Sequence, residues 1–549
     1  MANGNVTLTL VLVGLVLALA GCGGEEPATG GPSQADAGAD AGAACAPGEL
    51  PLDGGGCQPA GLPPDMPCPP GETLNEAGGC CPAGTMPLDD GSCRPAGIPP
   101  EMCGEGFEPD GSRGCEPILP AEPCPKGNGL MAIPGETKCR EVAPCGSGTW
   151  GDIPVDDATQ YVDAAYAGGD SDGSAERPWT SIQAGIDAAK PGGIVAVAAG
   201  TYAEDVLIKG KPVRLWGRCP GLVEVVGSGA ALAAVFVKKG ADESEIHSLG
   251  IRGEKCGILV SGSKQVQIDR VWIHDTAQRG LDVERALGPT SVTVKASLVE
   301  TARELGVFVS GSDATIEATV VRDTQPDEKD LVGGRSIHIQ DTDTGQRAAV
   351  TVRTSLIERN HEVGVCVLGS DASIEASVVR DTQSDAKGEW EFGRGISIER
   401  DPDTGERAEV AVRSSFIEMN RGVGVFVAGS DATIEASVVR DTQPHGDGRF
   451  GDGVVVVSKS ASATALVIAT RIENSARVAL SNFGAKVTLG WNIFQCAVFD
   501  LEGEEYLGSA YSFNHLGGNV CGCPEATEEC EMVSAEIEPP EPLPPLDPP

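Results

Sequence analysis

The chain has 549 residues, enough for several domains, and only 4% of them are aromatic. Its 40 basic residues stand against 80 acidic ones, so the formal net charge is −40 at pH 7. Nucleic acids and anionic membrane surfaces repel such a chain, which argues against both as partners. Neutral polymers and cations are easier partners.

The N-terminus predicts export. An apolar stretch from Leu8 to Leu19, too short for a stand-alone membrane span, leads into Leu19-Ala20-Gly21-Cys22. This pattern resembles a bacterial lipoprotein signal with its lipobox, although Met1 to Asn5 contain no Lys or Arg. The resemblance implies that residues 1–21 are a signal peptide and that Cys22 carries acyl chains. The protein would then be a lipoprotein whose partner is the membrane that holds Cys22.

The residues behind this cysteine refine the prediction. Gly23 rather than Asp follows it, which by the same resemblance favours the outer membrane of a bacterial cell envelope, facing the periplasm or the cell surface. Residues 22–44 are rich in Gly, Ala, Asp and Pro and predict a flexible, lipid-anchored linker. No later segment approaches 18 uninterrupted apolar residues, so a transmembrane helix is not expected.

Residues 45–147 form a first repeat, rich in Cys, Pro and Gly, and 11 of the 19 cysteines lie in it. In an exported chain these predict disulfides that staple a region of little core and little regular structure. Zinc is not expected, because the segment has no His and no Cys-x-x-Cys. The odd count predicts one partner outside the segment, with Cys219 as a candidate. Four pairs share a spacing of twelve: Cys45/Cys57, Cys68/Cys80, Cys81/Cys93 and Cys103/Cys115.

The next segment, from about residue 148, predicts the start of a larger domain. A capping box, Thr180-Ser-Ile-Gln183, opens a short helix with Ile182 and Ile186 on one face. The helix is expected to end at Lys190-Pro-Gly-Gly193, and a strand follows that runs into Gly200-Thr-Tyr202.

A second repeat, of about 22 residues, occupies residues 245–495, and its apolar anchors alternate with polar residues as in a half-buried strand. The anchors are Ile246, Ile268, Val294, Ile316, Val352, Ile374, Val412, Ile434, Val467 and Leu489. The residues that follow the anchors alternate in sign: Asp269, Lys295, Glu317, Arg353, Glu375, Arg413, Glu435. A second alternating series lies further along each repeat: Glu300, Arg322, Glu358, Arg380, Glu418, Arg440, Glu473.

Both series make sense if each repeat stacks on the last with equivalent strands about 4.8 Å apart. The fold class predicted for residues 148–520 is therefore all-β, a right-handed parallel β-helix with a short N-terminal capping helix. Each ion pair is expected to be exposed and to contribute about 0 to 1 kcal/mol, so the ladders fix register more than they stabilise. His274 occupies the ladder position before Glu300, and Arg322-Asp323-Thr324 recurs twice, so both are predicted to be structural.

The strand, the Gly/Asp loop, the helix and the Gly200-Thr-Tyr202 strand resemble the opening segment of right-handed parallel β-helix proteins of the pectate-lyase-like superfold. There the helix covers the N-terminal end of the core. The resemblance spans roughly residues 160–500 and implies a fold rather than an activity, because relatives include lyases, hydrolases, epimerases and inactive binders. Trp272-Ile-His-Asp275 reverses the last two residues of the lyase signature Trp-Ile-Asp-His, so that activity does not carry over.

Three insertions, at residues 325–335, 383–394 and 443–452, lie at equivalent positions of the repeat and are expected to stack on one side. Aromatic side chains beside charged donors suit sugar stacking or a protein contact. The alternative is that they fold down as a local lid over the helix exterior. The candidate ligand-binding residues are Arg335, Trp390, Phe392, Arg394, Arg449 and Phe450.

The loops Asp341-Thr-Asp-Thr-Gly345 and Asp401-Pro-Asp-Thr-Gly405 have carboxylates at a Ca²⁺-like spacing. Val352 and Val412 stand where a full calcium loop has its last acidic ligand, so Asx-rich turns are expected instead. No catalytic residue, metal ligand or cofactor is assigned, and Ca²⁺ is the one alternative.

Residues 521–549 predict a tail that first contains cysteines and then becomes a disordered Pro/Glu-rich segment, with Cys496 pairing with Cys521, Cys523 or Cys530. These features predict an envelope-anchored surface scaffold, adhesin or glycan-binding module, with a glycan or another surface protein as partner. The alternative is a polysaccharide lyase or glycoside hydrolase acting on surface or environmental glycans. One unrepeated carboxylate cluster on a coil face would favour the enzyme.

Overall fold

The computed structural model describes residues 93–543, apart from 330, 385–391 and 525–529, together with short pieces of residues 49–92. The chain forms two compact units, residues 1–61 and 62–549. In the first, β1 (Glu49–Pro51) and β2 (Cys57–Pro59) pair as an antiparallel hairpin. Cys22 and Cys45 lie outside the described residues. The acylation of Cys22 and the Cys45/Cys57 pair therefore stay predictions.

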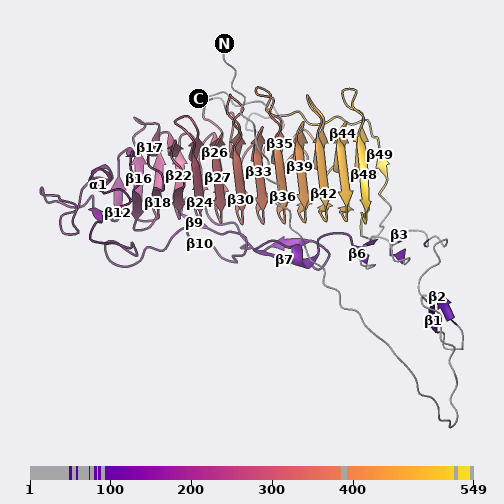
Figure 1. Ribbon diagram of the computed structural model, residues 1–549, viewed down its shortest axis with the longest axis horizontal. Helices are drawn as coiled ribbons and strands as arrows, with labels where there is room; N and C mark the ends of the chain where they lie inside the picture. The colour runs from indigo at the N-terminus through magenta and orange to yellow at the C-terminus, as the bar shows by residue number, and fades with distance from the viewer. Residues whose placement is uncertain are drawn as a thin grey trace, which may run out of the picture. The chain divides into compact units, whose positions relative to one another are not determined.

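Three long parallel sheets form the body of the second unit, and the chain visits sheets 1, 2 and 3 in turn (Figure 1). Sheet 1 contains β11 (Gln160–Val162), β12 (Ile194–Val197), β15 (Arg214–Gly217), β18 (Glu245–His247), β21 (Val266–Asp269), β24 (Ser291–Lys295), β27 (Asp313–Glu317), β30 (Ala349–Arg353), β33 (Asp371–Glu375), β36 (Glu409–Arg413), β39 (Asp431–Glu435), β42 (Thr464–Ile468), β45 (Lys486–Gly490) and β48 (Ser512–Gly517).

Sheet 2 contains β13 (Gly200–Tyr202), β16 (Val223–Gly227), β19 (Gly250–Gly253), β22 (Trp272–Thr276), β25 (Leu298–Glu300), β28 (Val320–Arg322), β31 (Leu356–Glu358), β34 (Val378–Arg380), β37 (Phe416–Glu418), β40 (Val438–Arg440), β43 (Arg471–Glu473) and β46 (Ile493–Gln495). Sheet 3 contains β14 (Val206–Lys209), β17 (Ala233–Lys238), β20 (Cys256–Ser261), β23 (Leu281–Glu284), β26 (Leu305–Ser310), β29 (Arg335–Gln340), β32 (Val363–Leu368), β35 (Arg394–Glu399), β38 (Val423–Ala428), β41 (Asp452–Val457), β44 (Val478–Phe483), β47 (Phe499–Glu504) and β49 (Met532–Val533). Three consecutive strands make one coil, and the fold is the predicted right-handed parallel β-helix.

The register is the one that the repeat predicted. Ile268 pairs with Val294 and Val294 with Ile316, and the same column continues to Leu489. No anchor is more than 1% exposed, and all of them belong to one apolar cluster that fills the helix. The second charge series is likewise in register, from His274 opposite Glu300 to the last pair of the column. The repeated apolar anchors and the charges of alternating sign therefore specify the register in which the coils stack.

The short helix α1 (Ile182–Ala188) packs against the first coil, with Ile182 and Ile186 buried as predicted. Its N-cap is Ser181 rather than the first residue of the expected capping box, because the Ser181 hydroxyl accepts from the amide of Ala184. The Glu204 carboxylate accepts from two further amides of the first turn. Within the described part of the chain, no helix is long and apolar enough to cross a bilayer.

The cysteine-rich segment folds into small antiparallel hairpins: β3 (Thr73–Leu74) with β4 (Cys80–Cys81), β5 (Thr85–Pro87) with β6 (Cys93–Pro95), β7 (Phe107–Pro109) with β8 (Cys115–Pro117), and β9 (Leu130–Met131) with β10 (Arg140–Glu141). A one-turn 3₁₀ helix, η1 (Pro100–Met102), lies between the second and third. Three of the four cysteine pairs with a spacing of twelve, whose connectivity the sequence left open, form disulfides: Cys68–Cys80, Cys81–Cys93 and Cys103–Cys115. Cys124 pairs with Cys139, and Cys145 finds the predicted outside partner, Cys219.

Residues 94–145 do not form a separate stalk, because they lie along the outer face of sheet 2. Ile98, Met131 and Val142 are buried there against side chains such as Val320 and Phe416. The segment starts beside β45, where Gly97 donates to the carbonyl of Trp491, and ends at the Cys145–Cys219 disulfide near the first coils.

The described part of residues 531–543 packs on the helix, although the sequence placed it in a disordered tail; residues 544–549 lie outside the described residues. Cys496 pairs with Cys523, one of its three predicted partners, and Cys521 pairs with Cys530. Residues 531–543, called the strap below, then run back across the outer face of sheet 3. The strap side chain Leu543 is buried against Phe392 and Cys366, because the outer face of sheet 3 is apolar enough to bind it.

Candidate functional site

A long groove follows the outer face of sheet 1, from β21 to β45. Sheet 2 is covered by residues 94–145 and part of sheet 3 by the strap, whereas the groove stays open to solvent and has a volume of about 1160 Å³. Nine strands line it, so at about 4.8 Å per strand it is about 40 Å long. An open, straight furrow of this length suits an extended chain better than a compact ligand.

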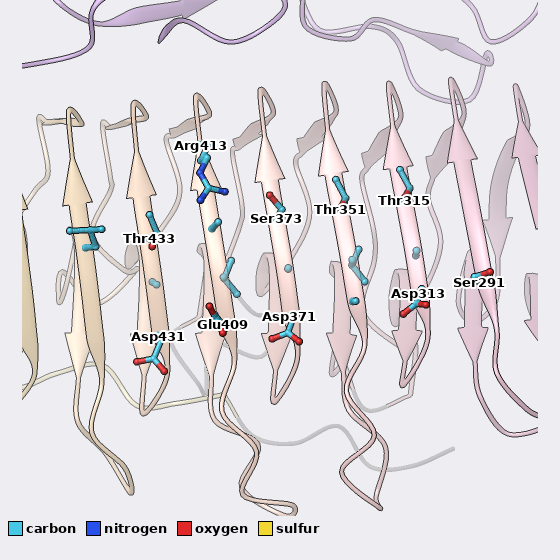
Figure 2. Close-up of a pocket in the computed structure, with 18 of the residues that line it drawn as sticks. Ser291, Asp313, Thr315, Thr351, Asp371, Ser373, Glu409, Arg413, Asp431 and Thr433 are labelled. Atoms are coloured by element: carbon cyan, nitrogen blue, oxygen red, sulfur yellow. The ribbon is translucent and has the colours of Figure 1, made fainter. Parts of the chain in front are cut away.

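The floor of the groove is a column of outward-facing side chains, one from the middle of each strand, and six of the nine carry a hydroxyl group. Figure 2 shows Thr315, Thr351 and Ser373 in this row on three neighbouring strands, and Thr433 two strands further along. The whole column reads Gln267, Thr293, Thr315, Thr351, Ser373, Ala411, Thr433, Leu466 and Thr488. The structure therefore presents mainly hydroxyl groups at a regular spacing along the floor.

One edge of the groove is acidic. Asp313, Asp371, Glu409 and Asp431 stand in a row at the starts of their strands (Figure 2). Asp371 is paired with Arg347, whose Nε lies 3.1 Å away, and Asp431 is paired in the same way with Arg407 at 3.2 Å. Both arginines come from the loops that follow β29 and β35, two coils apart. Asp313 and Glu409 have no ion pair within the described part of the chain, so their carboxylates are available to a ligand.

The other edge is the first charge ladder. Glu317 lies 3.5 Å from Lys295 and 2.8 Å from Arg353, and Arg413 lies 3.3 Å from Glu435. The hydrogen bond from Arg353 lowers the pKa of Glu317. About half of the Lys295 and Arg353 side chains is exposed, as expected for a ladder that sets register and adds little stability.

Two carboxyl groups meet beside the acidic edge, in the loops that the sequence singled out for a Ca²⁺-like spacing. Asp341 is only 1% exposed, and Thr404 donates to its Oδ2 at 2.6 Å. Burial and the neighbouring Asp401 raise the pKa of Asp341 to about 7. The two loops meet across Gly369, where a Cβ atom would lie 2.7 Å from Asp341 Oδ1. Asp401 itself forms the predicted Asx turn, since it accepts from the amides of Asp403 and Thr404.

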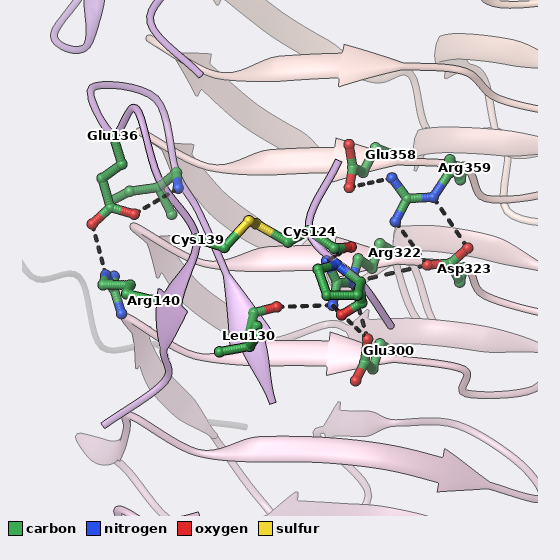
Figure 3. The surroundings of a disulfide bond; sticks show 12 residues. Cys124, Leu130, Glu136, Cys139, Arg140, Glu300, Arg322, Asp323, Glu358 and Arg359 are labelled. Carbon is green, nitrogen blue, oxygen red and sulfur yellow. Dashed lines mark hydrogen bonds and ion pairs between the residues drawn. A yellow bond between two sulfur atoms is a disulfide. The ribbon is translucent and has the colours of Figure 1, made fainter. Parts of the chain in front are cut away.

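The second ladder is buried, which corrects the expectation of exposed pairs. Arg322 is 1% exposed and Glu300 is fully buried, and their side chains pair at 2.7 Å. Arg322 also donates to the carbonyls of Cys124 and Leu130, so the disulfide-bonded segment is hydrogen-bonded to the ladder (Figure 3). The pairs built from the recurring Arg-Asp-Thr motif are thus structural, as predicted.

Of the residues predicted to bind ligand, three are buried, two lie at the surface and one lies outside the described residues. Arg335, Phe392 and Arg394 are at most 2% exposed on the outer face of sheet 3. Arg335 pairs with Glu362 at 2.9 Å, and Arg394 pairs with Glu399 and donates to a strap carbonyl. Here the alternative reading, a lid over the helix exterior, describes what the structure shows.

Arg449 and Phe450 belong to the third insertion and remain at the surface. The Arg449 side chain is 58% exposed and pairs with Asp447, and the guanidinium groups of Arg449 and Arg477 lie 5.4 and 5.1 Å from the Phe450 ring. Trp390 lies outside the described residues. The sequence analysis did not predict the groove. The sequence does contain a sign of it, because the outward-facing residue between two core residues is uncharged, and usually Thr or Ser, in successive repeats.

No group of three or more His, Cys, Asp or Glu side chains that suits a metal ion occurs among the described residues. Two free cysteines, Cys256 and Cys366, are buried, and burial raises the pKa of each thiol to about 12. Both thiols are therefore poor nucleophiles at neutral pH.

Neither a protein-family model nor a curated protein sequence matches the chain. Among solved structures, a catalytic domain of a GH87 α-1,3-glucanase in complex with tetrasaccharides is similar at 12% identity and a TM-score of 0.42, covering 69% of this chain and 71% of that one. The A-module of the mannuronan C-5 epimerase AlgE4 of Azotobacter vinelandii matches at 15% identity and a TM-score of 0.38, covering 61% and 94%. An alginate lyase from Paenibacillus sp. strain FPU-7 matches at 15% identity and a TM-score of 0.29, covering 52% and 90%. These likenesses concern the fold alone, which is the right-handed parallel β-helix.

Proposed function

We propose that this protein is a lipid-anchored component of a bacterial cell envelope that binds an extended polysaccharide in the groove of sheet 1. The observation that carries the proposal is the open groove across nine strands, six of which contribute a Thr or Ser hydroxyl to its floor. Sugar hydroxyls both donate and accept hydrogen bonds, and so do Thr and Ser. Because each contact is weak, we expect affinity to rise with polymer length.

The charges favour a neutral or cationic polymer. The chain carries a formal net charge of −40, and one edge of the groove adds a row of carboxylates. An anionic polymer would meet repulsion at the acidic edge, whereas hydroxyl or ammonium groups would find acceptors at Asp313 and Glu409. The groove is lined by no aromatic residue, so recognition depends on hydrogen bonds rather than on stacking.

A second candidate is cleavage of the bound polymer by a glycoside hydrolase or lyase mechanism. The observation in its favour is the carboxyl pair of Asp341 and Asp401 beside the groove, with one pKa near neutrality. A general acid has to reach the glycosidic oxygen, and Asp341 is only 1% exposed. Binding without cleavage therefore has the stronger support.

The test uses the chain without residues 1–21, immobilised on beads and offered a panel of neutral, cationic and anionic polysaccharides. We expect retention of one neutral or cationic polymer without shortening, and a loss of retention of at least about tenfold in Thr351→Arg, which fills the groove. Thr201→Arg is the matched control, because Thr201 is exposed on sheet 2 at the far end of the helix. Equal retention by both variants, or retention of anionic polymers alone, would refute the proposal. Shortened products that disappear in Asp341→Asn would establish the enzyme instead.

A further inference from the structure

A buried carboxyl group near the C-terminal end of the helix, that of Glu502, has a second carboxyl group, that of Glu504, as its side-chain hydrogen-bond partner among the described residues. Glu502, in the last long strand of sheet 3, is fully buried, and neither of its carboxyl oxygens accepts a hydrogen bond from a backbone amide or from another kind of side chain among the described residues. Ser481 stands beside it on the neighbouring strand, is also fully buried, and has an unpartnered hydroxyl. Buried oxygens without such a partner are costly and rare, so three of them side by side require an explanation.

The neighbouring charges do not compensate Glu502. Arg477, whose positive charge acts on Glu502, is already paired with Asp452, with Nε 2.8 Å from the Asp452 carboxylate. The next outward side chain on the same strand is a second carboxyl group, Glu504; burial, a hydrogen bond shared with Glu504 and repulsion from Glu504 together raise the pKa of Glu502 to about 8. Ionisation of both carboxyl groups would therefore place two negative charges side by side, with no cation of their own among the described residues.

The strap closes this site from outside. Its strand β49 pairs with β47, with Val533 opposite Glu502. Glu504 accepts from the Ser534 hydroxyl at 2.9 Å and from the Glu536 amide at 2.7 Å. Further along, Ile537 packs against the apolar cluster that contains Phe426. Whatever neutralises Glu502 and Glu504 therefore also holds the start of the strap on sheet 3.

We infer that Glu502, Glu504 and the Ser481 hydroxyl bind one Ca²⁺ ion that fastens the strap to the last coils. Ca²⁺ takes six to eight oxygen ligands, including bidentate carboxylates, peptide carbonyls and water, in a flexible arrangement. An all-oxygen set without His or Cys excludes the softer transition metals as preferred ions. Two carboxylates supply the charge, and water and peptide oxygens complete the shell. This site is separate from the groove and does not depend on the proposed function.

The first measurement is calorimetric titration of CaCl₂ into the metal-stripped chain without residues 1–21, at pH 7.5. We expect one ion per chain, and a loss of affinity of at least about tenfold in Glu502→Gln. Glu505→Gln is the matched control, because this substitution removes the same charge at an exposed position three residues after Glu502. Absence of Ca²⁺ binding, or equal binding by the two variants, would overturn the inference.

The second measurement reports on the strap. A protease that cuts after Glu can open the chain at Glu536–Ile537, within the strap. We expect Ca²⁺ to slow this cleavage at least several-fold in the native chain and not in Glu502→Gln. If cleavage is independent of Ca²⁺ and Glu502→Gln is protected as well as the native chain, a proton shared between the two carboxyl groups explains the site, and the calcium inference is wrong. Because the polysaccharide assay reads a different face, its outcome is independent of this one.

Discussion

The buried ladder predicts that chemically similar ion pairs differ greatly in their effect on stability. Arg322→Met removes a guanidinium that is 1% exposed and leaves Glu300 buried without its partner. It also removes the hydrogen bonds from Arg322 to the carbonyls of Cys124 and Leu130. Breaking a buried pair by removing one partner costs about 3 to 5 kcal/mol. Arg353→Met removes a half-exposed partner of Glu317 and should cost about 0 to 1 kcal/mol.

The assay is urea unfolding of the oxidised chain, followed by far-ultraviolet circular dichroism at pH 7. We expect Arg322→Met to lower the free energy of unfolding at least about 2 kcal/mol more than Arg353→Met does. The double variant Glu300→Gln, Arg322→Met should recover about 1 to 3 kcal/mol of the loss, because it no longer leaves a buried charge unpaired. Equal losses in the two single variants would show that residues 94–145 do not shield the second ladder from water, and the reasoning would fail.

Three further predictions concern the second charge ladder, the buried carboxyl group of Asp341 and the N-terminal Cys22. Arg380→Glu should lower the melting temperature well below that of Arg380→Ala, because it places a third carboxylate between Glu358 and Glu418. These two carboxylates lie 2.8 and 3.7 Å from the Arg380 guanidinium. Equal melting temperatures of the two variants would contradict the ladder. The pKa of Asp341 is raised to about 7 from 3.8, so the native state keeps a proton that the unfolded chain has lost, and stability should fall as the pH rises from about 4 to about 7; Asp341→Asn should flatten this slope in thermal melts, and an unchanged slope would refute it. Cys22→Ala should release the protein from the membrane fraction, and mass spectrometry should find acyl chains on the native cysteine alone; membrane retention of the variant would rule out the lipid anchor.

The sequence by itself determined the fold and its register. Apolar anchors such as Ile316 and Val352 repeat in step with charges that alternate at Glu317 and Arg353, and both signals lie within a few residues of each other in every coil. Such local, repeated information needs no knowledge of distant contacts, since each coil touches only its neighbours. The expected disulfides are present, and three of the four cysteine pairs with a spacing of twelve are bonded to each other, because each closes one hairpin; the sequence alone left their connectivity open.

Only the tertiary structure decided which faces of the helix are covered. Arg322 and Arg353 occupy equivalent alternating series in the sequence, yet residues 94–145 bury the first and leave the second half exposed. The sequence predicted that Phe392 and Arg394 form an exposed binding surface. In the structure they are covered by the strap, which lies about 150 residues later in the sequence. Which outer face an aperiodic segment covers depends on long-range apolar contacts that leave no periodic trace in the chain. The groove of sheet 1 is a candidate site because these segments cover other faces, and that is a property of the packed molecule rather than of any repeat.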